Sequence, residues 1–128
     1  MNDKTCLSFD KSQEGVVLLE SLIAILIFSL GVLGIVGLQA AMIKSTSDAK
    51  FRSEASYIAQ QRVGQMWSDP ANVATYIEAA TDISALIPAG TRTVAQPLPG
   101  GPYVVTVTWQ QPGEAVHNFT TIASIAGG

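Results

Sequence analysis

Hydrophobic side chains fill an early stretch of the chain almost without a break, whereas polar and apolar positions alternate near its end. Between Gly15 and Ile43 the single ionisable side chain is that of Glu20. A bilayer core about 30 Å thick is crossed by about 20 apolar residues in a helix, so this run predicts a membrane-spanning segment. It is also longer than the roughly 7–15 apolar residues of a cleaved secretory signal, which favours a retained helix.

The helix is expected to continue past the apolar run, because no proline occurs before Pro70. From about Val16 to about Trp67 it would be on the order of 75–80 Å long. Its second half is polar except for one stripe at three-to-four spacing, which predicts a face packed on the rest of the protein. The stripe consists of Phe51, Ala55, Ile58, Ala59, the stem of Arg62, Val63 and Met66.

The last third of the chain predicts a small antiparallel sheet. In residues 103–109 the side chains of Tyr103, Val105, Val107 and Trp109 recur with period two, which is typical of a half-buried strand. Residues 110–114 predict a turn, and residues 116–125 predict the return strand. Residues 91–96 predict a shorter strand, and the composition of residues 71–80 after Pro70 suggests a short second helix. The expected class is α+β: a long N-terminal membrane-spanning helix packed distally on two or three strands.

Composition excludes several classes of function. The chain is 48% hydrophobic and 13% charged, with a net charge of -3, and it has no basic patch of the kind that binds nucleic acid. Two basic residues precede the apolar run and three follow it closely, so the positive-inside rule gives no orientation. Cys6 is the only cysteine, so no disulfide within the chain is expected. His117 is the only histidine, with no second ligand at metal spacing and no nucleophile pattern beside it. We expect no enzyme, cofactor or metal site.

Placing the carboxylate of Glu20 inside the membrane costs free energy. The cost is smaller if Glu20 lies in the first helical turn near the interface, or if a cation pairs with it. The residues around it resemble the type IV prepilin cleavage signature: a glycine, a hydrophobic residue that starts the mature chain, and a glutamate fifth in that chain. Gly15, Val16 and Glu20 match these positions. The resemblance implies a leader over residues 1–15, a membrane and filament-core half-helix over 16–43, and a head over 44–128.

The same resemblance implies a processing pathway. Prepilin peptidase in the bacterial inner membrane would cut between Gly15 and Val16 and methylate the new amine of Val16. In the fibre, Glu20 of one subunit would pair with the Val16 amine of a neighbour. At about 4 Å and an effective dielectric of 20, such charges attract by roughly 4 kcal/mol.

The glycine-spaced residues 29–39, and Gln60-Gln61-Arg62 ahead of Met66-Trp67, resemble PilV-type minor pilins. This implies a single-pass inner-membrane protein with a periplasmic head that later joins the pilus (fimbrium), where it acts in assembly, adhesion or twitching motility. The implied partners are prepilin peptidase, other minor and major pilins, inner-membrane lipid and the pilus assembly machinery.

Two other functions stay open: a minor pseudopilin of type II secretion, which has the same N-terminus, and an uncleaved, membrane-anchored periplasmic binding module. Gly31, Gly34 and Gly37 also allow three interpretations. They permit close helix–helix approach, they mark a place where the helix bends or melts in a filament, or they are ordinary glycines of a membrane helix.

Overall fold

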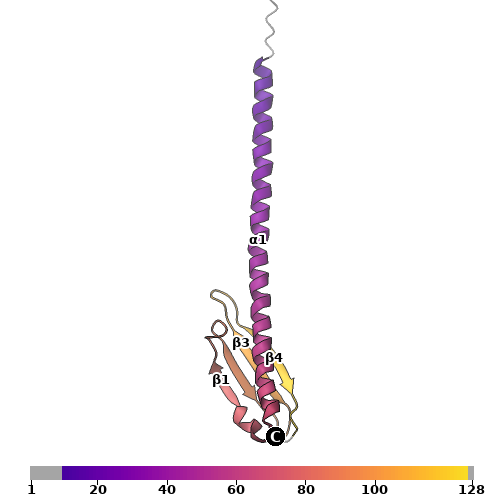
Figure 1. Ribbon diagram of the computed structural model, residues 1–128. Helices are drawn as coiled ribbons and strands as arrows, with labels where there is room; N and C mark the ends of the chain where they lie inside the picture. The colour runs from indigo at the N-terminus through magenta and orange to yellow at the C-terminus, as the bar shows by residue number, and fades with distance from the viewer. Residues whose placement is uncertain (1–9, 127–128) are drawn as a thin grey trace, which may run out of the picture. The chain divides into compact units, whose positions relative to one another are not determined.

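The computed structural model describes residues 10–126, and the side chains of residues 13–126. Its elements in chain order are helix α1 (Asp10–Ser68), the 3-10 helix η1 (Pro70–Tyr76), and strands β1 (Glu78–Asp82), β2 (Thr91–Ala95), β3 (Tyr103–Trp109) and β4 (His117–Ala123) (Figure 1). The chain divides into two compact units, residues 1–44 and 45–128, and each is described by itself. Cys6 and residues 1–9 of the expected leader lie outside the described residues.

Helix α1 is continuous from Asp10 to Ser68. It begins before the expected first residue, Val16, because the polar residues that precede it include no proline to prevent helix formation. It ends where expected: Pro70 has no backbone N–H with which to continue the ladder, and the hydroxyl of Ser68 donates to the carbonyl of Gln65 at 2.7 Å. The predicted long helix is therefore confirmed.

The expected second helix over residues 71–80 is wrong in its second half. Only Pro70–Tyr76 is helical, as the 3-10 helix η1. The backbone is extended at Ile77, and Glu78 then pairs with Val94 of β2. Alanine-rich composition favours a helix only weakly, and here the ladder with β2 outweighs it.

The four strands form one antiparallel sheet in the order β1-β2-β3-β4, so each strand pairs with the next along the chain. The pairs include Arg92 with Val107 and Val107 with Phe119. Strand β1 was not expected, and its pairing is irregular, with a register shift between Glu78 and Thr81. Ala80, which lies inside this irregularity, has a positive φ of 53°.

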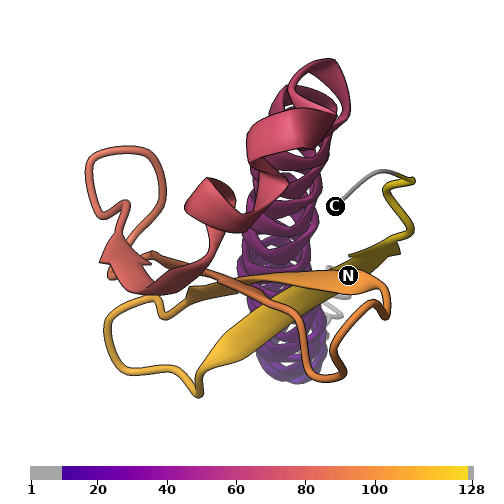
Figure 2. The same cartoon turned by 90° about the horizontal axis from the view of Figure 1, so that it is seen from below.

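Strand β3 confirms the period-two prediction, because its odd-numbered residues from Tyr103 to Trp109 are buried and its even-numbered residues are half-buried. The last turns of α1 and helix η1 lie on the same face of the sheet (Figure 2). The predicted stripe of α1 packs there: Ala55, Ile58, Ala59 and Met66 are buried, and Phe51 and Val63 are partly buried against them.

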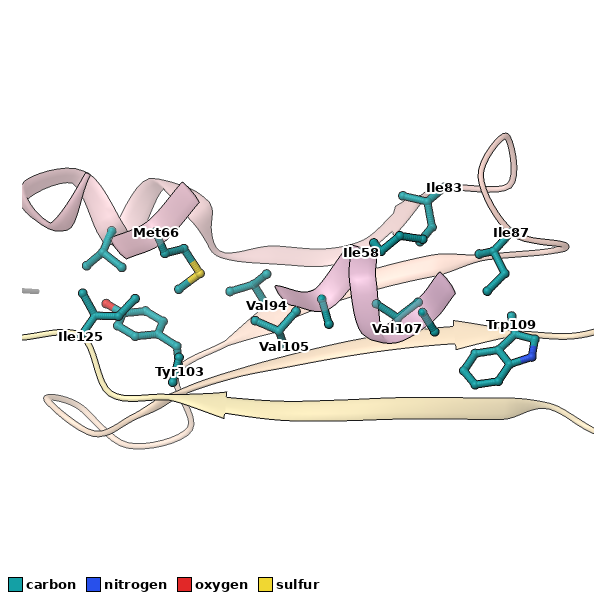
Figure 3. Packing of buried hydrophobic residues seen from close by; sticks show 14 residues of the cluster. Ile58, Met66, Ile83, Ile87, Val94, Tyr103, Val105, Val107, Trp109 and Ile125 are labelled. Carbon is teal, nitrogen blue, oxygen red and sulfur yellow. The ribbon is translucent and has the colours of Figure 1, made fainter. Parts of the chain in front are cut away.

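The core of residues 45–128 also takes in the connection between β1 and β2 (Figure 3). Ile83 and Ile87 from this connection are buried, and its ends are joined by a hydrogen bond from the N–H of Ile83 to the carbonyl of Gly90 at 2.9 Å. A Cβ on Gly90 would lie 2.2 Å from Cγ2 of Ile87, so only glycine fits at this end of the β1–β2 connection. The protein is thus α+β, with one long apolar N-terminal helix and a small four-stranded antiparallel sheet.

Candidate functional site

The apolar half of α1 is long and apolar enough to cross a membrane by its length and composition. Within residues 13–44 no side chain is buried, and the large apolar residues from Val16 to Ile43 are all exposed. Ser29 interrupts them without leaving a free donor, since its hydroxyl donates to the carbonyl of Ile25 at 2.8 Å. A contiguous apolar surface of this extent is typical of a segment that contacts a membrane or another protein.

The three residues that the sequence singles out for processing and assembly lie at the start of this surface. Gly15, Val16 and Glu20 are all helical and exposed. The nitrogen of Val16 is a peptide amide in the intact chain and carries no charge. Among the side chains that the structure describes, Glu20 has no hydrogen-bond or ion-pair partner. Any ion-pair partner of this carboxylate would therefore come from outside the described side chains of this chain.

The three glycines of the apolar segment have no internal packing role among the described residues. A Cβ built on Gly31, Gly34 or Gly37 meets nothing within 4 Å. The chain itself therefore does not require glycine at these positions, and all three interpretations from the sequence stay open.

The head, residues 45–128, contains a cluster of three charged side chains between α1 and the sheet. Glu78 of β1 receives hydrogen bonds from Arg92 of β2, from Nε at 2.8 Å and from Nη2 at 3.0 Å, and it also pairs with Arg62 of α1. The exposed fractions of the three side chains are 14% for Arg62, 15% for Glu78 and 17% for Arg92. The guanidinium of Arg62 also lies over the ring of Tyr76, 4.8 Å from its centroid.

This cluster favours the ionised form of Glu78. Burial opposes ionisation, but the hydrogen bond from Arg92 and the positive charges of Arg92 and Arg62 outweigh it. The pKa of the Glu78 carboxyl therefore lies below its ordinary value. The three residues join α1 to the first two strands, and their ion pairs hold these elements together.

A shallow groove runs beside α1 on the head. It has a volume of about 420 Å³ and is lined by residues of α1 and by Leu86 of the β1–β2 connection. Tyr57 and Leu86 are its apolar walls, with exposed fractions of 68% and 60%. The remaining lining residues include the polar Ser53, Glu54 and Gln61.

A second group of polar side chains lies where α1 meets the β3–β4 hairpin. Asp48 of α1, Glu114 of the hairpin turn and His117 of β4 each offer one potential metal ligand, and the three ligand atoms lie within 4.8 Å of one another. The sequence reasoning missed this group because Asp48 is distant from the other two along the chain. The three-residue spacing of Glu114 and His117 was the one available signal.

Comparisons with protein-family models, with curated proteins and with solved structures find no match to this chain.

Proposed function

We propose that this protein is a minor pilin of the type IV pilus, cut by prepilin peptidase and then built into the pilus or used to prime it. One observation carries the proposal. A carboxylate, Glu20, has no hydrogen-bond or ion-pair partner among the described side chains and lies at the start of an exposed apolar helix, five residues after Gly15. The α+β head, in which a long helix packs on a small antiparallel sheet, supports a pilin-like fold.

Processing would supply the missing partner. Cleavage after Gly15 turns the amide of Val16 into an amine, which is positively charged whether or not it is methylated. The amine of one subunit and Glu20 of a neighbour would then neutralise each other in the apolar core of a fibre. At about 4 Å and an effective dielectric of 20 their attraction is roughly 4 kcal/mol, which offsets much of the cost of burying both charges.

The helix itself sets a condition on this cleavage. The bond between Gly15 and Val16 lies inside α1, and a peptidase needs an unwound segment around the bond that it cuts. Gly15 lowers the cost of unwinding by about 1 kcal/mol relative to alanine. We therefore assign two roles to Gly15: it fits a narrow cleavage site, and it weakens the helix at that site.

The proposed setting follows from the same features. The apolar half of α1 anchors the precursor in the bacterial inner membrane in a single pass, with the head in the periplasm. Prepilin peptidase, inner-membrane lipid, the pilus assembly machinery and other minor and major pilins are the proposed partners. Adhesion and twitching motility would be the outputs of the assembled fibre.

N-terminal sequencing and intact mass of the purified protein test the proposal. Co-expression with prepilin peptidase should yield a 113-residue chain that begins at methylated Val16, after loss of 15 of the 128 residues. Gly15→Val should stay uncut, because it adds a branched side chain at the cleavage site. Gly31→Ala is the matched control and should be processed normally, since its added Cβ meets nothing. An intact Met1 in the presence of active peptidase contradicts the proposal.

The uncleaved membrane-anchored module is the second candidate, and the unbroken helix across Gly15 and Val16 favours it. The same experiment separates the two, because this candidate keeps Met1. A minor pseudopilin of type II secretion would be processed like a pilin. It differs by co-purifying with a secretion complex and not with pilus fibres.

A further inference from the structure

We propose that Asp48, Glu114 and His117 form a binding site for a divalent first-row transition-metal ion, and that zinc fits it. Their ligand atoms lie within 4.8 Å of one another, and all three residues are half-buried. The site lies wholly within residues 45–128. It does not depend on the proposed pilus function.

The donor set points to this class of ion. One imidazole and two carboxylates suit zinc and its first-row neighbours, whereas magnesium and calcium take oxygen ligands alone. Three protein ligands leave a fourth position for water or an outside ligand.

One of the three ligand-to-ligand distances is close to the distance that zinc requires. Ligand atoms at about 2.1 Å from a tetrahedral ion stand about 3.4 Å apart. Nε2 of His117 and Oε2 of Glu114 are 3.9 Å apart. Closing this gap takes a shift of about 0.5 Å, which small side-chain rotations supply.

Neighbouring side chains hold two of the ligands in position. The amide of Gln111 donates to Oδ1 of Asp48 at 2.9 Å, which fixes that carboxylate beside the hairpin. The ring of His117 stacks on Trp109, with centroids 5.7 Å apart and an angle of 22° between the planes. Supports of this kind orient metal ligands and strengthen binding.

Hydrogen bonds fix the conformation of the hairpin turn, so bringing Glu114 and His117 together requires little loss of conformational entropy. The N–H of Glu114 donates to the carbonyl of Gln111 at 3.1 Å, and the side chain of Gln110 donates to the carbonyl of Glu114 at 2.9 Å. Gly113 has a φ of 77°, which allows the chain to reverse at this point.

Trp109, whose ring stacks on His117, carries a donor that none of the described residues satisfies. Its side chain is 2% exposed, and its Nε1 is buried without a hydrogen-bond partner among the described residues. The nitrogen lies on the side of the ring away from Val107 (Figure 3). A buried donor usually has an acceptor, so a water or anion at the edge of the indole, beside the stacked ring of His117, would satisfy it.

A bound ion would join α1 to the β3–β4 hairpin, at the opposite edge of the sheet from the Arg62–Glu78–Arg92 cluster. Because the three ligands meet only in the folded head, the ion binds the folded state and stabilises it. The site is therefore a structural clamp with one open coordination position.

Zinc titration of the full-length, untagged protein in mild detergent tests the proposal. The test uses a Cys6→Ser background, which removes the only thiol, after treatment with EDTA. Calorimetry should find one zinc ion per chain, and saturating zinc should raise the melting temperature by at least about 5 °C. Magnesium at the same concentration should give no shift.

Four variants assign the ligands. Asp48→Asn, Glu114→Gln and His117→Gln should each weaken zinc binding at least about tenfold. Glu54→Gln changes a half-buried acid on the same helix that is not one of the three ligands; it is the matched control and should bind like the parent. Equal affinity in all four variants, or no binding to the parent up to about 1 mM zinc, overturns the proposal.

Fluorescence adds a local readout. In a Trp67→Phe background Trp109 is the sole tryptophan, and cobalt bound at His117 should quench its emission because the two rings stack. Glu114→Gln should need at least about ten times more cobalt for the same quenching. Quenching that is unchanged by Glu114→Gln would assign the ion to another place and refute the site.

Discussion

Replacing Glu78 by glutamine should destabilise the head strongly, although the change is nearly isosteric. Glu78 is the one acid that holds both Arg62 and Arg92. The glutamine side chain would keep one acceptor oxygen but present an amide group to the second guanidinium. Two cations would then lie close together without an anion between them.

The size of the effect follows from the geometry of the cluster. Hydrogen bonds to charged groups contribute about 1.5–3 kcal/mol each, and Glu78 accepts from both arginines with a side chain that is 15% exposed. Part of the loss is offset because the neutral amide is easier to bury. We expect a net decrease of about 2–3 kcal/mol in the free energy of unfolding, which for a head of this size lowers the melting temperature by roughly 8–24 °C.

The pH dependence has a definite sign. The pKa of folded Glu78 lies below its ordinary value of 4.5, so its stabilising contribution is complete above that value. The contribution is lost as the pH falls through the folded pKa. The difference in stability between wild type and Glu78→Gln should therefore shrink in acid. Asp82 also has a lowered pKa, through a hydrogen bond from the backbone of Ser84. Because Asp82 is present in both proteins, its contribution cancels in the difference in stability between wild type and Glu78→Gln.

Urea unfolding of the full-length protein in mild detergent, followed by tryptophan fluorescence, measures these changes because Trp109 is buried in the head. Glu54→Gln is the control: its pair with Lys50 spans 3.8 Å, and the two side chains are 38% and 66% exposed. Such surface pairs contribute about 0–0.5 kcal/mol. If Glu78→Gln unfolds at the same urea concentration as Glu54→Gln, the reasoning about the cluster is refuted.

Three further predictions test the core, the backbone and the membrane segment. Met66→Ala should lower the free energy of unfolding by about 2–5 kcal/mol in the same assay, because Met66 is fully buried, whereas exposed Met42→Ala should change it by less than about 0.5 kcal/mol. Ala80→Gly should stabilise the head by about 0.5–1 kcal/mol, because its φ of 53° is strained for alanine; Ala79→Gly should destabilise it, and equal effects would contradict the strain. Glu20→Ala should leave membrane extraction unchanged while reducing incorporation into sheared pili at least about tenfold, as measured by immunoblot; normal incorporation removes the ion-pair argument.

Local patterns predicted the elements whose periodicity is strong. The absence of proline before Pro70 predicted the end of the long helix α1. The period-two spacing of Tyr103, Val105, Val107 and Trp109 predicted strand β3 and its buried face. Strand β1 was missed because residues 78–82 have low strand propensity and are held by pairing with β2 and by the arginines of the Glu78 cluster. The metal-ligand group was missed for a related reason: Asp48 meets His117 only after α1 packs on the sheet.

The simple strand order has a consequence for how the head folds. Every strand pairs with its neighbour in the chain, so the sheet can grow hairpin by hairpin, with short loops to close. The contacts between α1 and the sheet are the distant ones, and they come last because closing a longer loop costs more entropy. We therefore expect low contact order, rapid sheet formation and a slower docking of the Met66 face of α1. A destabilising change at Met66 should then speed unfolding more than it slows folding.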